Sequence, residues 1–321
     1  MNETEPAPRL SISMVHHNGL LALDECMASL LQNPPSCSYE IIIVDNVSTD
    51  GARDMLRSRY PTVCLIENET RKGFGENQNT GIRASRGEYI LLLNDDTIIH
   101  EGAFDCLVAY LDSHPESAVV GPRLLNGDGS LQVSCYRFPS PLRRMFENLL
   151  FNAAFPNHPI VGDHRSWPHD TERDVEYVSG AALLVRRSVI DRVGLFDTRF
   201  FMYAEEADWQ KRMHADGWKV SFCPSSVITH LGGQSSTGMK DRQFCEFNRS
   251  QVKFIRKHYG VWGAAVQRVA MLIGACLRLA IWGTLRMAPA HRAAARKQLA
   301  LWSRLLRWWL GLGPNAGLSD L

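Results

Sequence analysis

The sequence predicts an α/β fold in which a mostly parallel sheet is flanked by helices, followed by a basic helical tail. Two observations predict it. Between residues 10 and 93, short apolar segments alternate with segments of helical periodicity, which is typical of βαβ units. Residues 247–319 then contain twelve Lys or Arg and no Asp or Glu, whereas residues 1–246 carry 23 basic and 33 acidic side chains. This asymmetry favours an anionic partner for the tail.

The elements follow from the pattern of apolar residues and turn residues. Strands are expected at 10–15, 39–44, 63–67, 89–93, 118–120 and 175–186, with short edge strands at 218–222 and 226–230. Helices are expected at 20–31, 52–59, 75–84, 102–113, 188–193 and 208–216. Residues 126–174 contain several prolines and are expected to form a long loop, which in a compact domain is usually functional or mobile.

Composition narrows the class of protein. Of the 321 residues, 45% are apolar, which is enough for a substantial core. The eight cysteines are scattered without a C-x-x-C pair, so we expect reduced thiols. Residues 1–9 are acidic and contain proline, so they lack the regions of a signal peptide and are expected to be disordered. We therefore expect a protein that stays on the cytoplasmic side.

The tail has the composition of a membrane-surface helix. Plotting residues 292–310 at 100° per residue places Leu and Trp side chains opposite a cationic face formed by Arg292, Arg296, Lys297, Arg304 and Arg307. The more apolar segment 261–285 is interrupted by Arg268 and Arg278, and a charge at the bilayer centre costs about 2.5–3.5 kcal/mol. Interfacial or re-entrant placement is favoured over a spanning helix. The alternative is packing on the rest of the chain or on another subunit.

Carboxylates end the apolar run of residues 91–93, where Asn94, Asp95 and Asp96 follow directly. Ligands of an open α/β sheet bind at the carboxyl ends of its strands. Mg²⁺ or Mn²⁺ is usually held by one or two carboxylates plus substrate phosphates, so this edge suits a nucleotide diphosphate. The alternative is an acidic turn.

Two further strand ends carry polar residues. Asp45, Asn46 and Ser48 follow the second strand and offer hydrogen-bond acceptors to a nucleobase, although such residues are also common in turns. The segment 68–81 contains Arg71 and Asn79 and supplies cations near a phosphate. It is not a dinucleotide-binding fingerprint, because Gln78 stands where the third glycine is required.

A third acidic group, Glu205, Glu206 and Asp208, opens a helix. The helix dipole alone favours carboxylates there, but a carboxylate beside a pocket also serves as a general base. His230 ends a strand just before two glycines, and a lone histidine in such a place is more often structural.

Taken in order, these elements resemble the family 2 glycosyltransferases, which have the GT-A fold and invert the anomeric centre. The resemblance covers about residues 10–231. Its motifs are His17-Asn18, Val44-Asp45-Asn46, Asn79-x-Gly81, Asn94-Asp95-Asp96, Gly180-Ala181 and Glu205-Glu206-x-Asp208. Within the family the chain looks most like the rhamnosyltransferase and galactofuranosyltransferase branch. Two positions depart from the family pattern: His17 stands where Tyr is common, and Glu206 stands where Asp is frequent.

The resemblance implies a role for each motif. Asp45 would contact the base, Asp96 assisted by Asp95 would hold a divalent cation on the donor diphosphate, and His230 would complete that site. Glu206 would be the catalytic base, with Glu205 and Asp208 nearby. The substrate-binding residues would be Asn18, Asp45, Asn46, Ser48, Arg71, Asn79, Asn94, Asp95 and Gly180.

The resemblance also implies a domain plan and partners. Residues 10–246 would form the catalytic domain, with a nucleotide-binding half at 10–125 and an acceptor half at 126–246, and residues 247–321 would associate with an anionic membrane surface on its cytoplasmic face. The donor would be a nucleotide-diphosphate sugar, with rhamnose favoured, and the acceptor a polyprenyl-linked or cell-wall glycan. Assembly as a homo-oligomer stays open.

Two other functions remain as alternatives. One is a non-catalytic membrane-bound scaffold with the same fold, against which the retained acidic residues and His230 count. The other is a sugar nucleotidyltransferase, which is disfavoured because residues 14–20 lack a glycine-rich phosphate loop. Nucleic acid is not expected as a partner, because the basic tail is interleaved with Leu and Trp.

Overall fold

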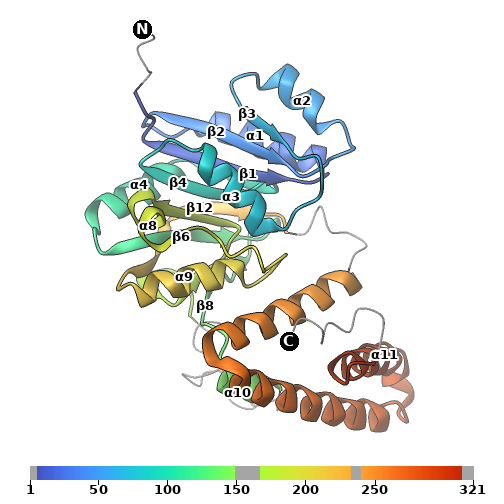
Figure 1. Ribbon diagram of the computed structural model, residues 1–321. Helices are drawn as coiled ribbons and strands as arrows, with labels where there is room; N and C mark the ends of the chain where they lie inside the picture. Colours follow the sequence, from blue (N-terminus) through green and yellow to red (C-terminus); the bar gives the residue numbers. More distant parts are fainter. Residues whose placement is uncertain (1–5, 149–166, 233–239, 313–321) are drawn as a thin grey trace. The chain divides into compact units, whose positions relative to one another are not determined.

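The computed structural model describes residues 6–148, 167–232 and 240–312 (Figure 1). The chain divides into two compact units: Met1–Phe138 with Pro168–Phe247, and Pro139–Trp167 with Asn248–Leu321. The end of the first unit at Phe247 lies one residue beyond the boundary expected from the change in composition. The segment Pro139–Trp167, which the sequence places in the catalytic domain, belongs to the second unit.

The first unit holds most of the strands. They are β1 (Leu10–His16), β2 (Tyr39–Asp45), β3 (Cys64–Glu67), β4 (Tyr89–Asn94), β5 (Thr97–Ile99), β6 (Ser117–Leu125), β7 (Leu131–Gln132), β8 (Cys135–Tyr136), β9 (Arg173–Val175), β10 (Tyr177–Val178), β11 (Ala182–Arg186) and β12 (Lys219–His230). Its helices are α1 (Leu20–Gln32), α2 (Ala52–Arg59), α3 (Phe74–Ala84), α4 (Ala103–Ser113), α8 (Arg187–Val193) and α9 (Glu205–Ala215).

The main sheet has the strand order β3-β2-β1-β4-β11-β6-β12-β5. Strands β1 to β4 are parallel, β11 runs antiparallel between β4 and β6, and β12 is parallel to β6. The predicted α/β class with a mostly parallel sheet is confirmed. Because β1, β2 and β4 are parallel, their carboxyl ends meet at one edge, as expected for Asp45 and the Asp95-Asp96 pair.

The two faces of β1 explain how the helices pack. Leu10, Ile12 and Met14 point into an apolar core shared with helices α1, α2 and α4. Ser11 and Ser13 point to the other face, where α3 crosses closely. A Cβ on Gly81 of α3 would lie 2.1 Å from the Ser13 hydroxyl, so this crossing requires glycine.

Two expected strands differ from the structure. The segment expected as one strand at 175–186 is broken: β9 pairs with β12, β10 pairs with β8 in a separate small sheet, and β11 enters the main sheet. The two expected edge strands at 218–230 are one strand, β12, which has a register shift between Cys223 and Val227 and lies between β6 and β5. A β-bulge accommodates Pro224 there without ending the strand.

The expected loop 126–174 contains regular structure in its described part. Strands β7, β8 and β9 belong to the first unit, and helix α5 (Pro141–Asn148) belongs to the second. Residues 149–166 lie outside the described part of the chain. The expected disordered segment 1–9 includes Arg9, which is held by Asp112 at 2.6 Å and by Ser38.

The second unit contains α5, most of α10 (Lys240–Leu285), a short 3₁₀ helix (Pro289–His291) and α11 (Arg292–Trp309). Helix α10 is kinked at Gly260, whose φ of 69° lies in the left-handed region. Residues Glu246–Leu285 are long and apolar enough to cross a membrane, judged by length and composition alone.

The amphipathic pattern of α11 is present, and its apolar face is partly covered. Leu305 and Trp309 are buried, and Arg268 of α10 donates a hydrogen bond to the Trp309 carbonyl oxygen. The other Leu and Trp side chains of that face, between residues 299 and 308, are half-buried, so the expected contact of this face with lipid stays a prediction.

Candidate functional site

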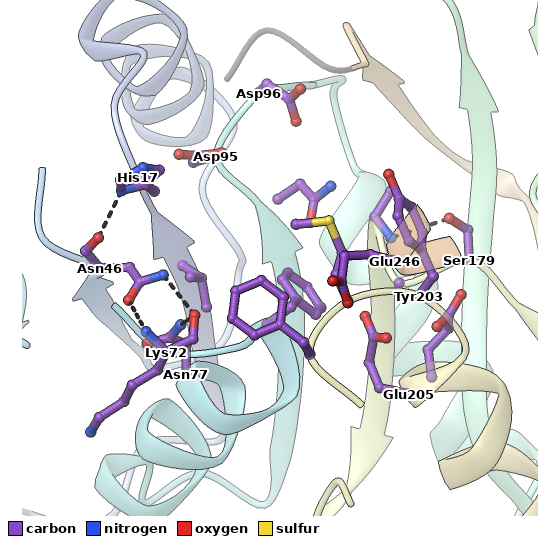
Figure 2. A pocket seen from close by; sticks show the side chains of 18 of the residues that line it. His17, Asn46, Lys72, Asn77, Asp95, Asp96, Ser179, Tyr203, Glu205 and Glu246 are labelled. Atoms are coloured by element: carbon purple, nitrogen blue, oxygen red, sulfur yellow. Dashed lines mark hydrogen bonds between the residues drawn. The ribbon is translucent and has the colours of Figure 1, made fainter. Parts of the chain in front are cut away.

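A cavity of about 360 Å³ lies at the carboxyl edge of the parallel strands. Figure 2 shows Asp95 and Asp96 on one side of it and Glu205 and Glu246 on the other. Nine of the sequence-predicted site residues line this cavity: Asn46, Arg71, Asn94, Asp95, Asp96, Gly180, Glu205, Glu206 and His230. Five do not, namely Asn18, Asp45, Ser48, Asn79 and Asp208.

Asp96 and His230 come together from β4 and β12. His230 Nε2 lies 3.2 Å from Asp96 Oδ1 and 3.2 Å from the Asn94 amide nitrogen. His230 Nδ1 donates to Gln132 Oε1 at 2.7 Å, so in the neutral ring the lone pair of Nε2 faces Asp96. The Gln132 amide is oriented in turn, because its nitrogen donates to Asn126 Oδ1 and to the His230 carbonyl oxygen.

This donor set fits a divalent cation. Two ligands in adjacent octahedral positions at about 2.1 Å from an ion are about 3.0 Å apart, close to the separation of Asp96 and His230. A ligating histidine usually donates its other N–H to an acceptor, as His230 does to Gln132. Among the described residues no group of three His, Cys, Asp or Glu side chains converges. A cation here would therefore need oxygens from a bound substrate or from water.

The Asp95 carboxylate contacts His16 and not His230. Its Oδ2 lies 2.5 Å from Nδ1 of the buried His16, whose Nε2 lies 3.9 Å from Asp50. Burial raises the pKa of Asp95, and the hydrogen bond with His16 opposes that rise. Asp95 lines the cavity but, unlike Asp96, makes no ion pair with His230 in the part of the chain described.

Asp45 does not line the cavity but directly precedes Asn46, which does. It is fully buried, and its Oδ2 is held by Arg53 at 2.5 Å and by the backbone N–H of Ser48 at 3.1 Å. Its other oxygen, Oδ1, is buried and has no hydrogen-bond partner among the described residues. An unsatisfied buried carboxylate oxygen is costly and points to an absent donor.

Asn46 organises the loop that carries the basic residues. Its amide makes two hydrogen bonds with the Lys72 backbone, at 3.0 and 2.9 Å. The Asn77 amide nitrogen donates to the carbonyl oxygens of Lys72 and Gly73. Asn46, Lys72 and Asn77 lie together on one side of the cavity (Figure 2). These contacts fix the backbone that presents Arg71 and Lys72 at the cavity wall.

The predicted residues outside the cavity have structural contacts. Asn18 Oδ1 accepts from the Thr49 N–H, and Ser48 Oγ accepts from the Asn18 N–H. Both amide atoms of Asn79 bond the backbone of Phe196. Buried Asp208 accepts from Arg212, which also bonds two backbone carbonyl oxygens. These four residues shape the frame around the cavity.

The start of α9 is strained at the cavity. Tyr203 and Ala204 have φ values of 69° and 66°, which cost about 1–2 kcal/mol each for residues with a Cβ. The preceding segment is held where Phe74 N–H donates to the Phe201 carbonyl oxygen at 2.8 Å. A Cβ on Gly73 would lie 2.8 Å from that oxygen, so glycine is required. The strain places Glu205 and Glu206 at the cavity wall.

Glu205 and Glu206 have different proton affinities. Burial, and then the neighbouring Glu206 carboxylate, raise the pKa of Glu205 well above its ordinary range. Burial also raises the pKa of Glu206, but hydrogen bonds from the backbone N–H groups of Glu206 and Ala207 oppose that rise. Oε2 of each side chain is buried without a hydrogen-bond partner among the described residues. Glu205 therefore holds its proton more tightly than Glu206 does.

Several residues at the site were not predicted. Gln132 and His16 orient His230 and Asp95, and Phe201, Met202, Tyr203 and Glu246 line the cavity. The aromatic run before the acidic helix was a usable signal for Phe201 and Tyr203. Gln132 carried none, because it lies 98 residues from His230.

Comparison with known proteins agrees with the geometry. The family model described as glycosyl transferase family 2 matches residues 11–167. An N-acetylglucosaminyl-diphospho-decaprenol L-rhamnosyltransferase of Mycobacterium tuberculosis is 30% identical over 241 residues, covering 71% of this chain and 78% of that protein. Glycosyltransferase AglE of Haloferax volcanii is 21% identical over 98% of this chain and 96% of its own length.

Among solved structures, the mannosyltransferase PcManGT of Pyrobaculum calidifontis, in complex with GDP-Man and Mn²⁺, has a TM-score of 0.56 at 17% identity. The match covers 95% of this chain and 88% of that one, and it shows a shared fold. The 30% identical relative and the matching family model lead to one assignment: this chain belongs to glycosyl transferase family 2.

Proposed function

We propose that the protein transfers a sugar, with rhamnose favoured, from a nucleotide-diphosphate sugar to a hydroxyl of a lipid-linked glycan, with inversion at the anomeric carbon. The observation that carries the proposal is the arrangement of one cavity between two acidic groups. Asp96 with His230 lies on one side, and Glu205 with Glu206 lies on the other. The 30% identical relative is named as an L-rhamnosyltransferase with a diphospho-decaprenol acceptor, which supports both the sugar and the acceptor class.

The nucleotide end of the donor is assigned to the β1–β2 side of the cavity. Asp45 directly precedes Asn46, which lines that side, and its Oδ1 is an unsatisfied acceptor; a base N–H is a donor of the kind it lacks. Arg53 orients the Asp45 carboxylate through Oδ2. Arg71 and Lys72 supply positive charge for the diphosphate.

Asp96 and His230 would hold a divalent cation, Mg²⁺ or Mn²⁺, together with diphosphate oxygens. The bound cation would neutralise charge on the departing nucleotide diphosphate. Gln132 keeps the Nε2 lone pair of His230 directed at Asp96. The Asn94 amide nitrogen lies 3.2 Å from the same nitrogen, on the strand side of the ring.

Glu206 is the proposed general base. It would take the proton from the acceptor hydroxyl as that oxygen attacks the anomeric carbon, and the bond to the nucleotide diphosphate would break in the same step. Glu205 remains protonated and is a positioning residue. Its burial beside Glu206 raises the proton affinity of the pair toward the range that a base needs near neutral pH.

We further propose peripheral association with the cytoplasmic face of a membrane, where a polyprenyl-linked acceptor would be met. The twelve basic residues of 247–319 without a carboxylate support it. A non-catalytic scaffold is the second candidate, but strain at Tyr203 and Ala204 is typical of a functional site.

A turnover screen tests the proposal. The full-length protein would be incubated with Mn²⁺, a polyprenyl-diphosphate N-acetylglucosamine acceptor, and dTDP-rhamnose, UDP-sugars or GDP-sugars in turn. We expect transfer with one donor class, dTDP-rhamnose first, and release of the nucleoside diphosphate in equal amount. Binding of donors without turnover in any combination would support the scaffold instead.

A further inference from the structure

Helix α10 presents an exposed apolar face beyond the kink at Gly260. The exposed side chains recur at intervals of three or four and so share one side of the helix: Trp262, Val266, Val269, Ile273, Leu277 and Ile281. Trp262 is 83% exposed. At 1.5 Å per residue this face is about 28 Å long.

The two charges within this segment turn away from that face. Arg268 donates to the Trp309 carbonyl oxygen. Arg278 donates to the Asn148 carbonyl oxygen at 2.5 Å and lies over the Trp302 ring at 4.5 Å. The interruption expected from the sequence is thus absent from the exposed side, because both guanidinium groups pack against α5 and α11.

An arginine cluster lies where α10 ends. Arg286, Arg292 and Arg296 line a depression of about 340 Å³ together with Gly283 and Met287, and Met287 is itself 80% exposed. None of the three guanidinium groups has a carboxylate or hydrogen-bond partner among the described residues. Three unpaired guanidinium groups around one depression are suited to phosphate oxygens.

We propose that this apolar face and the cluster of Arg286, Arg292 and Arg296 form one lipid-binding surface for an anionic phospholipid bilayer. The apolar face enters the boundary of the acyl chains, and the cluster binds lipid phosphates. The proposal rests on the proposed membrane association and names the surface that makes it. It adds a second apolar face to the Leu and Trp face of α11, which is partly covered within the unit.

Charge and exposure favour a bilayer lying alongside the helices. A second copy of the same surface would bring arginines against arginines, since residues 247–319 contain no carboxylate. Helix α11 exposes Arg292, Arg296, Lys297, Arg304 and Arg307 along its length. Spanning insertion would bury these charges, whereas α10 lying in the interface keeps them in water.

Vesicle flotation of the full-length protein tests the arginine cluster. We compare vesicles of phosphatidylcholine with and without phosphatidylglycerol, using the triple variant R286Q/R292Q/R296Q and a control of equal charge change on α11, K297Q/R304Q/R307Q. On the anionic vesicles we expect the cluster variant to bind about 100-fold more weakly and the control to lose less than tenfold. If both triple variants lose vesicle affinity equally, the attraction comes from the overall charge of the tail, and the proposed arginine site is wrong.

A second pair tests the apolar face. V269S/I273S changes two exposed positions of α10, and L21S/L31S is the matched control at exposed leucines of α1. We expect V269S/I273S to bind the vesicles about tenfold more weakly than the native protein. We expect L21S/L31S to bind them as tightly as the native protein does. If V269S/I273S instead converts an oligomer to a monomer and leaves vesicle binding unchanged, a second copy covers this face. Calorimetric titration of nucleotide-sugar donor is expected to be native in every variant, so this test is separable from the proposed catalysis.

Discussion

Gln132 Oε1 lies 2.7 Å from His230 Nδ1, and this one contact determines which nitrogen of His230 faces Asp96. The Gln132 amide cannot turn over without losing its hydrogen bonds to Asn126 and to the His230 backbone. A glutamine on β7 thus connects the orientation of a side chain on β12 to a carboxylate at the end of β4.

Replacement of Gln132 is predicted to weaken cation binding. Gln132→Leu removes the acceptor that holds Nδ1–H, and loss of such a partner costs about 10–100-fold in metal affinity. Gln132→Glu keeps an acceptor and should retain most of the affinity. Mn²⁺ titration followed by electron paramagnetic resonance, in the presence of nucleoside diphosphate, measures both. Native affinity in Gln132→Leu would show that His230 needs no such orientation.

Asp96→Ala is predicted to abolish the dependence of donor binding on a divalent cation, because Asp95 is bonded to His16 and cannot take over. Calorimetric titration of donor with and without Mn²⁺ tests this. The control is Asp95→Asn, which we expect to keep a clear Mn²⁺ dependence. The assignment fails if Asp96→Ala binds donor with an unchanged response to Mn²⁺.

Glu205→Gln is predicted to stabilise the protein at high pH. The pKa of Glu205 is raised in the folded state, so binding of its proton stabilises the folded protein. This stabilisation is complete below the pKa of the unfolded state and is lost as the pH rises through the pKa of the folded state. The glutamine amide in Glu205→Gln does not ionise, so that variant does not lose stability in this way as the pH rises. The thermal midpoint of Glu205→Gln should therefore exceed that of the native protein at pH 9 and approach it near pH 4.

Differential scanning calorimetry across that range measures the effect, and a difference of about 2–4 °C corresponds to about 1 kcal/mol in a domain of this size. Asp54→Asn on the surface of α2 is the control, because its carboxylate is highly exposed. A midpoint difference that stays constant with pH would show that the burial of Glu205 does not govern its ionisation.

The sequence predicted where the acidic residues lie but not which way they point. The apolar run before Asn94 was enough to place Asp95 and Asp96 at the carboxyl edge of the sheet. Their partners, His16 and His230, come from β1 and β12, and only the assembled sheet shows that the two neighbouring carboxylates separate. The local spacing of residues predicts the sheet edge at which the two carboxylates lie. Contacts between strands that are distant in sequence determine the direction in which each side chain points.

The C-terminal helices show the same limit of prediction from sequence. Periodicity correctly gave α11 an apolar face, yet it could not tell whether lipid or protein covers that face, since both remove the same area from water. Arg268 and Arg278 looked like interruptions because their partners, the carbonyl oxygens of Trp309 and Asn148, are distant in sequence. The strand at 175–186 was misjudged for a related reason, since its apolar pattern continues through a segment whose hydrogen bonds go to four different partner strands.

The central claim is that Glu206 acts as the base, and its replacement tests that claim most directly. Single-turnover transfer by Glu206→Gln is compared with Glu205→Gln and Asp208→Asn at saturating donor and acceptor. The account predicts that Glu206→Gln keeps native donor affinity while transfer falls by about 100-fold or more, and that the other two retain more activity. An active Glu206→Gln beside an inactive Glu205→Gln or Asp208→Asn would contradict the account.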